Sequence, residues 1–180
     1  MFTEFVKKIY TLVEETLEKL KTINDEIKEV KSDYAKKRIT AEVRAEKISE
    51  LNQQIPVIRA EYTGAANEIK KQFEEAVAKF FVVDGSKVHE DAKIFDYDVN
   101  LTEEQLQDLV NKHRDNSFML QLIRTYAEKH KLYPDMPKGE KAYRDGFEQF
   151  MRHASYTVYN GDSLTAAFFL DGHYDPHFDK

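Results

Sequence analysis

Three short clusters of the chain, and three single histidines, have the residue types that bind metals or catalyse reactions. In the first, imidazole and carboxylate side chains alternate at His173, Asp175, His177 and Asp179. Side chains two positions apart point to one side of an extended chain, and this donor set suits Zn²⁺ or another first-row divalent ion. These four residues are therefore candidate metal ligands. Pro176 favours an alternative, in which the tail is disordered or docks on a partner.

The second cluster, Gly161 to Leu164, reads GDSL, the block that names the GDSL hydrolases. In that family the serine lies near the start of an α/β domain, and its aspartate and histidine partners come far downstream. Here no strand pattern precedes the block, and only 16 residues follow Leu164. A turn followed by an N-cap serine explains the same letters. We therefore expect no catalytic residues, no enzyme activity and no cofactor.

The other histidines have simpler interpretations. His89, beside Glu90 and Asp91, falls in an irregular polar stretch and is interpreted as solvated. The remaining three lie near predicted helix ends or on helix faces, where an imidazolium complements the C-terminal helix dipole more often than it acts as a base. They are His113, His130 and His153.

Composition and charge narrow the class of protein. The chain has no cysteine, which excludes disulfides and thiolate metal sites and indicates a reducing compartment. We expect a cytoplasmic or virion protein with no membrane span, because no apolar run approaches the length required. The net charge of -6 belongs entirely to residues 84–180, since residues 1–83 are neutral. A neutral segment and an acidic one argue against nucleic-acid binding.

The elements that position these clusters begin with two long amphipathic helices over residues 2–81. Their apolar residues recur at spacings of three and four, the heptad pattern of a helix that another helix must cover. The candidate seam residues are Val13, Leu20, Ile23, Ile27, Val30, Ile48, Leu51, Ile55, Ile58 and Tyr62. This seam predicts a coiled coil, either within one chain or between copies in a homo-oligomer.

The pattern loses its phase after Tyr34, and Thr40 has the residue type of an N-cap. A short connection favours antiparallel neighbours, so we predict a helical hairpin. The alternative is one continuous helix of about 80 residues that pairs with another molecule. Thr3 is the predicted N-cap of the first helix, and Pro56 is expected to kink the second without breaking it.

The rest of the chain predicts short helices. Thr102 and Gln105 form a capping box, Ser117 is a candidate N-cap, and Ser163 is another. Residues 156–169 are predicted as helix, with an Asn-Gly β-hairpin as the alternative. The fold prediction is therefore all-α: a coiled-coil hairpin over residues 1–83, a linker over 84–100, and a small acidic helical domain over 101–180.

Residues 101–130 read LTEEQLQDLVNKHRDNSFMLQLIRTYAEKH. This segment resembles helical segments of uncharacterised phage and prophage structural proteins of Gram-positive bacteria. The likeness lies in LTEEQLQDL, a break, and a second helix that opens at an Asn-Ser-x-Met step. It implies a virion or assembly setting and no site residues. Phage scaffolding proteins usually end in a basic helix, whereas the tail of this chain is acidic, which leaves a structural, tail or assembly-accessory role.

Aromatic residues are dense towards the C-terminus, where they either pack the core or form a docking surface for a partner protein. The docking candidates are Tyr156, Tyr159, Phe168, Phe169, Tyr174 and Phe178. The leading hypothesis is a structural protein that acts through self-association and docking, with capsid or tail components as partners. The alternatives are a metal-dependent enzyme or sensor that uses the tail, and a chaperone-like binder of a partner chain.

Overall fold

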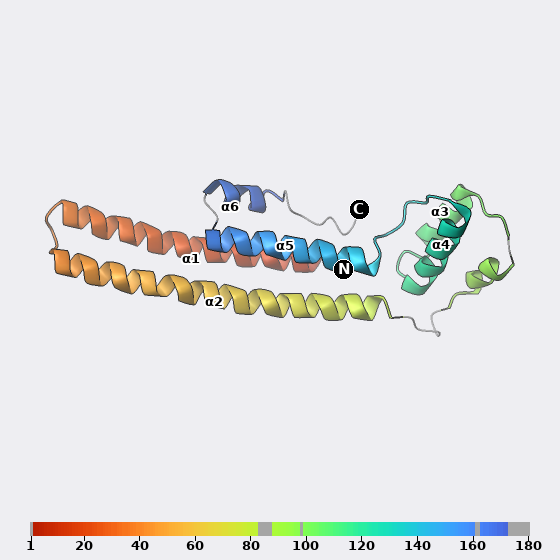
Figure 1. Cartoon of the computed structure of the whole chain (residues 1–180), viewed down its shortest axis with the longest axis horizontal. Helices are drawn as coiled ribbons and strands as arrows, with labels where there is room; N and C mark the ends of the chain where they lie inside the picture. Colours follow the sequence, from red (N-terminus) through yellow and green to blue (C-terminus); the bar gives the residue numbers. More distant parts are fainter. Residues whose placement is uncertain (1, 83–87, 98, 161–162, 173–180) are drawn as a thin grey trace. The chain divides into compact units, whose positions relative to one another are not determined.

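The computed structural model describes residues 2–82, 88–97, 99–160 and 163–172, and every regular element among these residues is helical. The elements are α1 (Thr3–Ala35), α2 (Ala41–Phe80), the 3-10 helix η2 (Glu90–Asp96), α3 (Glu103–Lys112), α4 (Ser117–His130), α5 (Glu140–Asn160) and α6 (Ser163–Leu170). The first two form a long hairpin (Figure 1). The predicted all-α class and the hairpin are confirmed.

The hairpin turns at residues 36–40. Lys37 has a left-handed backbone, with φ of 58°, and the Thr40 hydroxyl accepts the Val43 N–H at 3.3 Å. Thr40 is therefore the N-cap of α2, as predicted. The alternative of one continuous helix is wrong. The prediction for Thr3 was one residue off, because Phe2 occupies the N-cap position of α1. Helix α2 continues through Pro56 without a break.

The contacts divide the described chain into two compact units that differ from the predicted domains. The first unit contains residues 2–73 and 146–172, and the second contains the described residues between 74 and 145. Two predicted boundaries are thus displaced. Residues 146–172 belong with the hairpin because α5 and α6 supply the hairpin with buried aromatic side chains. The stretch 84–100, predicted as a linker, contains η2 and belongs to the second unit.

In the first unit α1 and α2 are antiparallel, and contacts along them keep one register. Near the open end, Phe5 meets Phe73 with ring centroids 5.7 Å apart, and further along Lys19 pairs with Glu61 at 3.7 Å. Towards the turn, Ile23, Ile27 and Leu51 form a buried cluster. The heptad seam of α1 therefore faces the seam of α2 within one chain.

Helix α5 lies along this hairpin as a third helix, parallel to α1. Phe147 stacks on Phe73 with centroids 3.9 Å apart, and Phe150 contacts Tyr10 at 5.1 Å. At its other end, the Tyr159 hydroxyl lies 2.8 Å from the Thr63 hydroxyl. The side chains around Phe147 are almost fully buried, so the greater part of the apolar core of this unit lies where three helices meet.

Helix α6 covers the third helix through a single fully buried aromatic side chain. Phe169 stacks on Phe150 at 5.3 Å and contacts Tyr10 at 5.0 Å. The helix ends at Leu170, and Gly172 follows with a φ of +80°, a left-handed conformation that favours glycine. The Gly172 N–H donates to the Phe169 carbonyl. Because residues 156–160 and 163–169 are helical, the alternative of a β-hairpin here is wrong.

The second unit packs η2, α3 and α4 around one apolar cluster. Its buried members are Leu106, Val110, Leu120, Ile123, Tyr126 and Ala127, and Phe95 of η2 packs against them. The predicted capping box at Thr102 and Gln105 is present. At the start of α4 the side chain of Asn116 accepts the Met119 N–H, so the N-cap is one residue before the predicted Ser117.

Polar side chains fasten the connections of the second unit. The Tyr126 hydroxyl donates to the Val99 carbonyl at 2.6 Å and accepts the Leu101 N–H at 3.0 Å. Gln107 accepts the Asp135 N–H at 2.7 Å through its side-chain oxygen and donates to the Asp135 carbonyl at 3.3 Å through its amide nitrogen. These bonds hold the chain before α3 and the loop after α4 against the helices.

Candidate functional site

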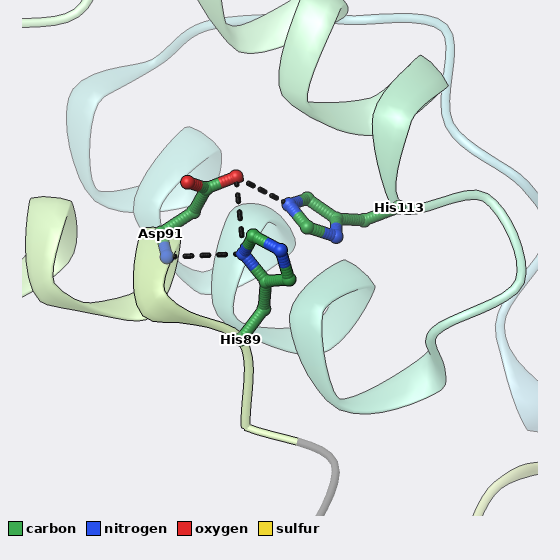
Figure 2. A group of neighbouring side chains, drawn as sticks. All are labelled: His89, Asp91 and His113. Carbon is green, nitrogen blue, oxygen red and sulfur yellow. Dashed lines mark hydrogen bonds and ion pairs between the residues drawn. The ribbon is translucent and has the colours of Figure 1, made fainter.

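The structure brings together three potential metal ligands that are separated in the sequence: His89, Asp91 and His113. Each offers one ligand atom, and these atoms all lie within 4.8 Å of one another. Figure 2 shows both imidazole rings turned towards the Asp91 carboxylate. This cluster lies entirely within the second unit.

Two helix ends position the cluster. His89 is the N-cap of η2, and its ring nitrogen Nδ1 accepts the Asp91 backbone N–H at 3.2 Å. Asp91 follows in the first turn of η2, where a carboxylate is favoured by the helix dipole. His113 is the residue at the C-cap of α3, where an imidazole suits the opposite end of a dipole. The packing of Phe95 on the apolar cluster brings η2 to the end of α3.

The Asp91 carboxylate is the centre of the cluster. Its Oδ2 atom lies 2.7 Å from Nε2 of His113, 2.7 Å from Nζ of Lys112 and 3.3 Å from Nδ1 of His89. The Lys112 ammonium, followed by the His113 ring, lowers the pKa of Asp91 from 3.8 to about 2. The carboxylate is therefore ionised at neutral pH.

The two imidazoles differ in exposure. His113 is buried, with 5% of its side chain accessible, whereas 45% of the His89 side chain is accessible. The rings contact each other at 4.7 Å between centroids. A buried imidazole, a partly exposed imidazole and an ionised carboxylate form a polar site with one side open to solvent.

From the sequence alone, His89 beside Asp91 is interpreted as solvated, and His113 as a helix-end residue. The helix-end position of His113 is confirmed, and His89 is partly exposed, whereas Asp91 is largely covered. The spacing of His89 and Asp91 repeats the imidazole–carboxylate alternation of the C-terminal tail. That alternation was the available signal, but nothing in the sequence links it to His113.

The tail residues proposed as metal ligands lie outside the described residues. These are His173, Asp175, His177 and Asp179. Gly161 and Asp162 of the GDSL block are also outside, and Ser163 begins α6. The tail prediction therefore stays a prediction.

The predicted seam residues meet one another inside a single chain. Val13 and Tyr62 are buried where α5 packs on the hairpin, and Leu20 is buried next to them. Closer to the turn, the seam forms the cluster whose buried members are Ile23, Ile27 and Leu51 and whose half-buried members are Val30, Ile48, Ile55 and Ile58. The hairpin buries the centre of the seam within one chain, so association with a second copy would have to use the parts of α1 and α2 that remain exposed.

The predicted docking residues divide into four groups. Phe169 is fully buried against Tyr10 and Phe150, so its assignment to a docking surface was wrong. Tyr159 is partly exposed, but its hydroxyl and ring contact Thr63 and Arg59, which gives it a packing role. Tyr174 and Phe178 lie outside the described residues.

The other two, Tyr156 and Phe168, are exposed and line a groove between α5 and α6. The groove has a volume of about 540 Å³, and Leu164, which is 65% exposed, lies on its wall. We call it the aromatic groove, lined by Arg152, His153, Tyr156, Thr157, Leu164, Thr165 and Phe168.

No family model, curated protein or solved structure matches the chain. None of the helices described is both long enough and apolar enough to cross a membrane.

Proposed function

We propose that the chain is a structural or assembly protein that acts by protein–protein contact, with the turn end of the hairpin as the main contact surface. The observation that supports this proposal most directly is the point at which the third helix stops. Helix α5 ends at Asn160, and its last turn contacts Arg59 and Thr63 of α2. Beyond that point α5 no longer covers α1 and α2, and α6 reaches this region only through Ala166 at the edge of a groove.

We call this uncovered part the two-helix arm: residues 24–35 of α1, the turn, and residues 41–55 of α2. Burial changes along the same two helices. In the three-helix part Ile9, Val13 and Phe73 are completely buried. In the arm Val30, Ile48 and Ile55 remain half-buried even though they pack against the seam cluster. Partly exposed apolar side chains at regular spacing are typical of a helix pair that takes a further helix.

A groove lies beside the end of α5, where the three-helix part gives way to the two-helix arm. Its volume is about 580 Å³, and its apolar lining includes Leu17, Ile55 and Val158. Charged and amide side chains also line it, namely Lys21, Asn24, Asp25, Lys28 and Arg59. We call it the arm groove.

The arm groove suits a second copy of this chain. Its rim carries charges of both signs: Lys28 donates to Asp25 at 2.7 Å and lowers the pKa of that carboxyl, so Asp25 is ionised at neutral pH. In a two-fold symmetric pair the same patch meets itself, and a patch with both signs can place lysine opposite aspartate. We therefore propose a homodimer in which the arm of each copy covers the arm groove of the other.

The mass of the protein in solution tests this proposal, and Asn24→Lys is the sharpest variant. Asn24 lies on the groove rim and is exposed, so the change leaves the seam intact. It adds a positive charge beside Lys21 and Lys28, and in a symmetric pair that charge faces its own copy. Light scattering should show a dimer for the wild type and a shift of the dimer dissociation constant by at least about tenfold for the variant.

The control is Asn67→Lys, the same change at an exposed position of α2 outside the arm. It should leave the dissociation constant unchanged. A wild type that stays monomeric at tens of micromolar concentration, or an equal effect of both variants, would contradict the proposal.

The aromatic groove is the second contact surface in this proposal. Tyr156, Leu164 and Phe168 present large apolar surface there, which is the usual composition of an interface anchor. The resemblance of residues 101–130 to phage structural proteins supports a virion or assembly setting, and it supports capsid or tail components as partners. Genes for coat, portal or tail proteins beside the gene for this chain would agree with that setting, and a metabolic operon would argue against it.

A further inference from the structure

We propose that His89, Asp91 and His113 form a binding site for a divalent first-row transition-metal ion of the Zn²⁺ type, which joins the start of η2 to the end of α3. The proposal rests on the second unit alone and is independent of the proposed dimer.

The donor atoms have the right chemistry. Imidazole nitrogen and carboxylate oxygen are the usual ligands of Zn²⁺ in sites without cysteine, and three protein ligands leave further positions for water. Asp91 Oδ2 lies 2.7 Å from His113 Nε2 and 3.3 Å from His89 Nδ1. Atoms bound about 2.0 to 2.1 Å from one metal ion lie about 3 to 3.5 Å apart in a tetrahedral arrangement, so these two pairs are already near that spacing. The ligand atoms of the two histidines lie within 4.8 Å of each other, and the partly exposed His89 ring can move to close that distance.

The hydrogen bonding of His89 leaves Nδ1 in the form that a metal ligand requires. This atom accepts the Asp91 backbone N–H, so it carries a lone pair and no proton. It also lies 3.3 Å from Asp91 Oδ2, the oxygen that His113 approaches. Because Nδ1 has one lone pair, a bound metal ion would replace the hydrogen bond from the Asp91 N–H.

His113 is the most rigidly placed of the three proposed ligands. It is buried and held by Asp91, so its position is fixed by the fold, and little side-chain freedom is lost when it binds. The Lys112 ammonium forms an ion pair with the same Asp91 oxygen at 2.7 Å, but 55% of the Lys112 side chain is exposed. Lys112 can therefore turn into solvent when a divalent ion replaces its charge.

The ligand set also predicts which ions are rejected. Mg²⁺ and Ca²⁺ prefer a shell of oxygen atoms, whereas two of the three ligands here are nitrogens. Zn²⁺, Co²⁺ and Ni²⁺ are the ions expected to bind. Bound metal adds a cross-link between η2 and α3, so it should stabilise the second unit against unfolding.

The test is calorimetric titration of the full-length, tag-free protein with Zn²⁺ at pH 7.5 after removal of metals with a chelator. We expect one Zn²⁺ per chain at this site. His113→Gln keeps a side-chain donor for Asp91 but removes the imidazole, and His89→Ala removes the second nitrogen. Each should weaken binding on the order of a hundredfold or more, since loss of even an outer partner costs ten- to a hundredfold. Mg²⁺ and Ca²⁺ should give no heat at this site.

The tail supplies the matched control, because it contains two other histidines with the same spacing to carboxylates. The double variant His173→Ala/His177→Ala should keep the Zn²⁺ stoichiometry and affinity of the cluster. If the tail variant loses all Zn²⁺ binding while His89→Ala and His113→Gln keep it, the proposal is wrong and the tail is the metal site. A wild type that binds no Zn²⁺ also overturns it.

Two measurements keep the result independent of folding. Circular dichroism of each metal-free variant shows whether the helices are retained, and Asp91→Asn provides a third variant with almost no change in size. Co²⁺ added to the wild type should give the visible absorption of a nitrogen- and oxygen-ligated ion, absent in a folded His89→Ala or Asp91→Asn protein. If those folded variants keep the Co²⁺ spectrum, the cluster is not the site.

Discussion

Side chains decide the local features of this protein, and the sequence predicts those whose partners are close along the chain. The capping box at Thr102 and Gln105 and the N-cap at Thr40 were predictable, because each depends on residues three positions apart. The cluster of His89, Asp91 and His113 was not predictable, since 22 residues separate Asp91 from His113. Their contact depends on the packing of η2, for which the sequence offers no periodic signal.

The ionised Asp91 predicts how stability depends on pH at the residue scale. Its pKa of about 2 lies below the unfolded value of 3.8, so Asp91 stabilises the native state above pH 4. That contribution is lost as the pH falls from about 4 through about 2. With a chelator present, Asp91→Asn should therefore remove part of the acid dependence of the unfolding free energy.

Urea titrations of both proteins between pH 6 and pH 2, followed by circular dichroism, measure this difference. The gap between wild type and variant should be largest above pH 4 and should close towards pH 2. Asp108→Asn, at an exposed position of α3 and in the same unit, is the control and should leave the acid dependence nearly unchanged. A constant gap at every pH would show that Asp91 acts through its shape and not through its charge.

Helix patterns predict the elements of this protein better than they predict which elements meet. The heptad pattern indicated two helices whose apolar seams must pack against another helix. In the hairpin, the two seams pack against each other. The same pattern could not indicate that α5, which begins about 60 residues after α2 ends, would complete the core. Phe147 and Phe150 fall in the predicted small helical domain, but their partners Phe73 and Tyr10 belong to the predicted hairpin. The displaced domain boundary has this cause.

Truncation of Phe147 tests the third helix at the element scale. Phe147 is 1% exposed and stacks on Phe73, so Phe147→Ala leaves a cavity where α2 and α5 meet. We expect a loss of about 3 to 5 kcal/mol in the unfolding free energy of the first unit. Phe168→Ala removes the same atoms from a side chain that is 46% exposed and should cost less than about 1 kcal/mol.

Denaturant unfolding measured by helix circular dichroism compares the two variants. If they lose equal stability, the third helix does not carry the core of this unit, and the arm and the three-helix part would be equally stable.

The hairpin as a whole should vary in stability along its length. The three-helix part has completely buried aromatic and aliphatic side chains, whereas the two-helix arm depends on a small cluster around Ile23, Ile27 and Leu51. Local opening costs less where fewer apolar contacts are lost. Hydrogen exchange should therefore be faster in residues 24–35 than in residues 3–16 of the same helix α1.

Mass spectrometry of deuterated peptides can measure both segments in one experiment. If a second copy covers the arm, protection of residues 24–35 should fall when the protein is diluted, while residues 3–16 should be unaffected. Equal exchange in both segments at every concentration would contradict the uneven stability and the dimer together. Uneven exchange that is independent of concentration would contradict the dimer alone.

The route of the chain has a consequence for its synthesis. Residues 74–145 are inserted between the two segments that form the first unit, so α5 leaves the ribosome well after α1 and α2. At about 5 to 20 residues per second, translation of this insertion takes roughly 4 to 14 seconds. During that interval Phe73 and Tyr10 lack the aromatic rings that later cover them. The nascent hairpin is thus a natural client for a chaperone that binds exposed aromatic side chains, and slow codons within the insertion would prolong its exposure.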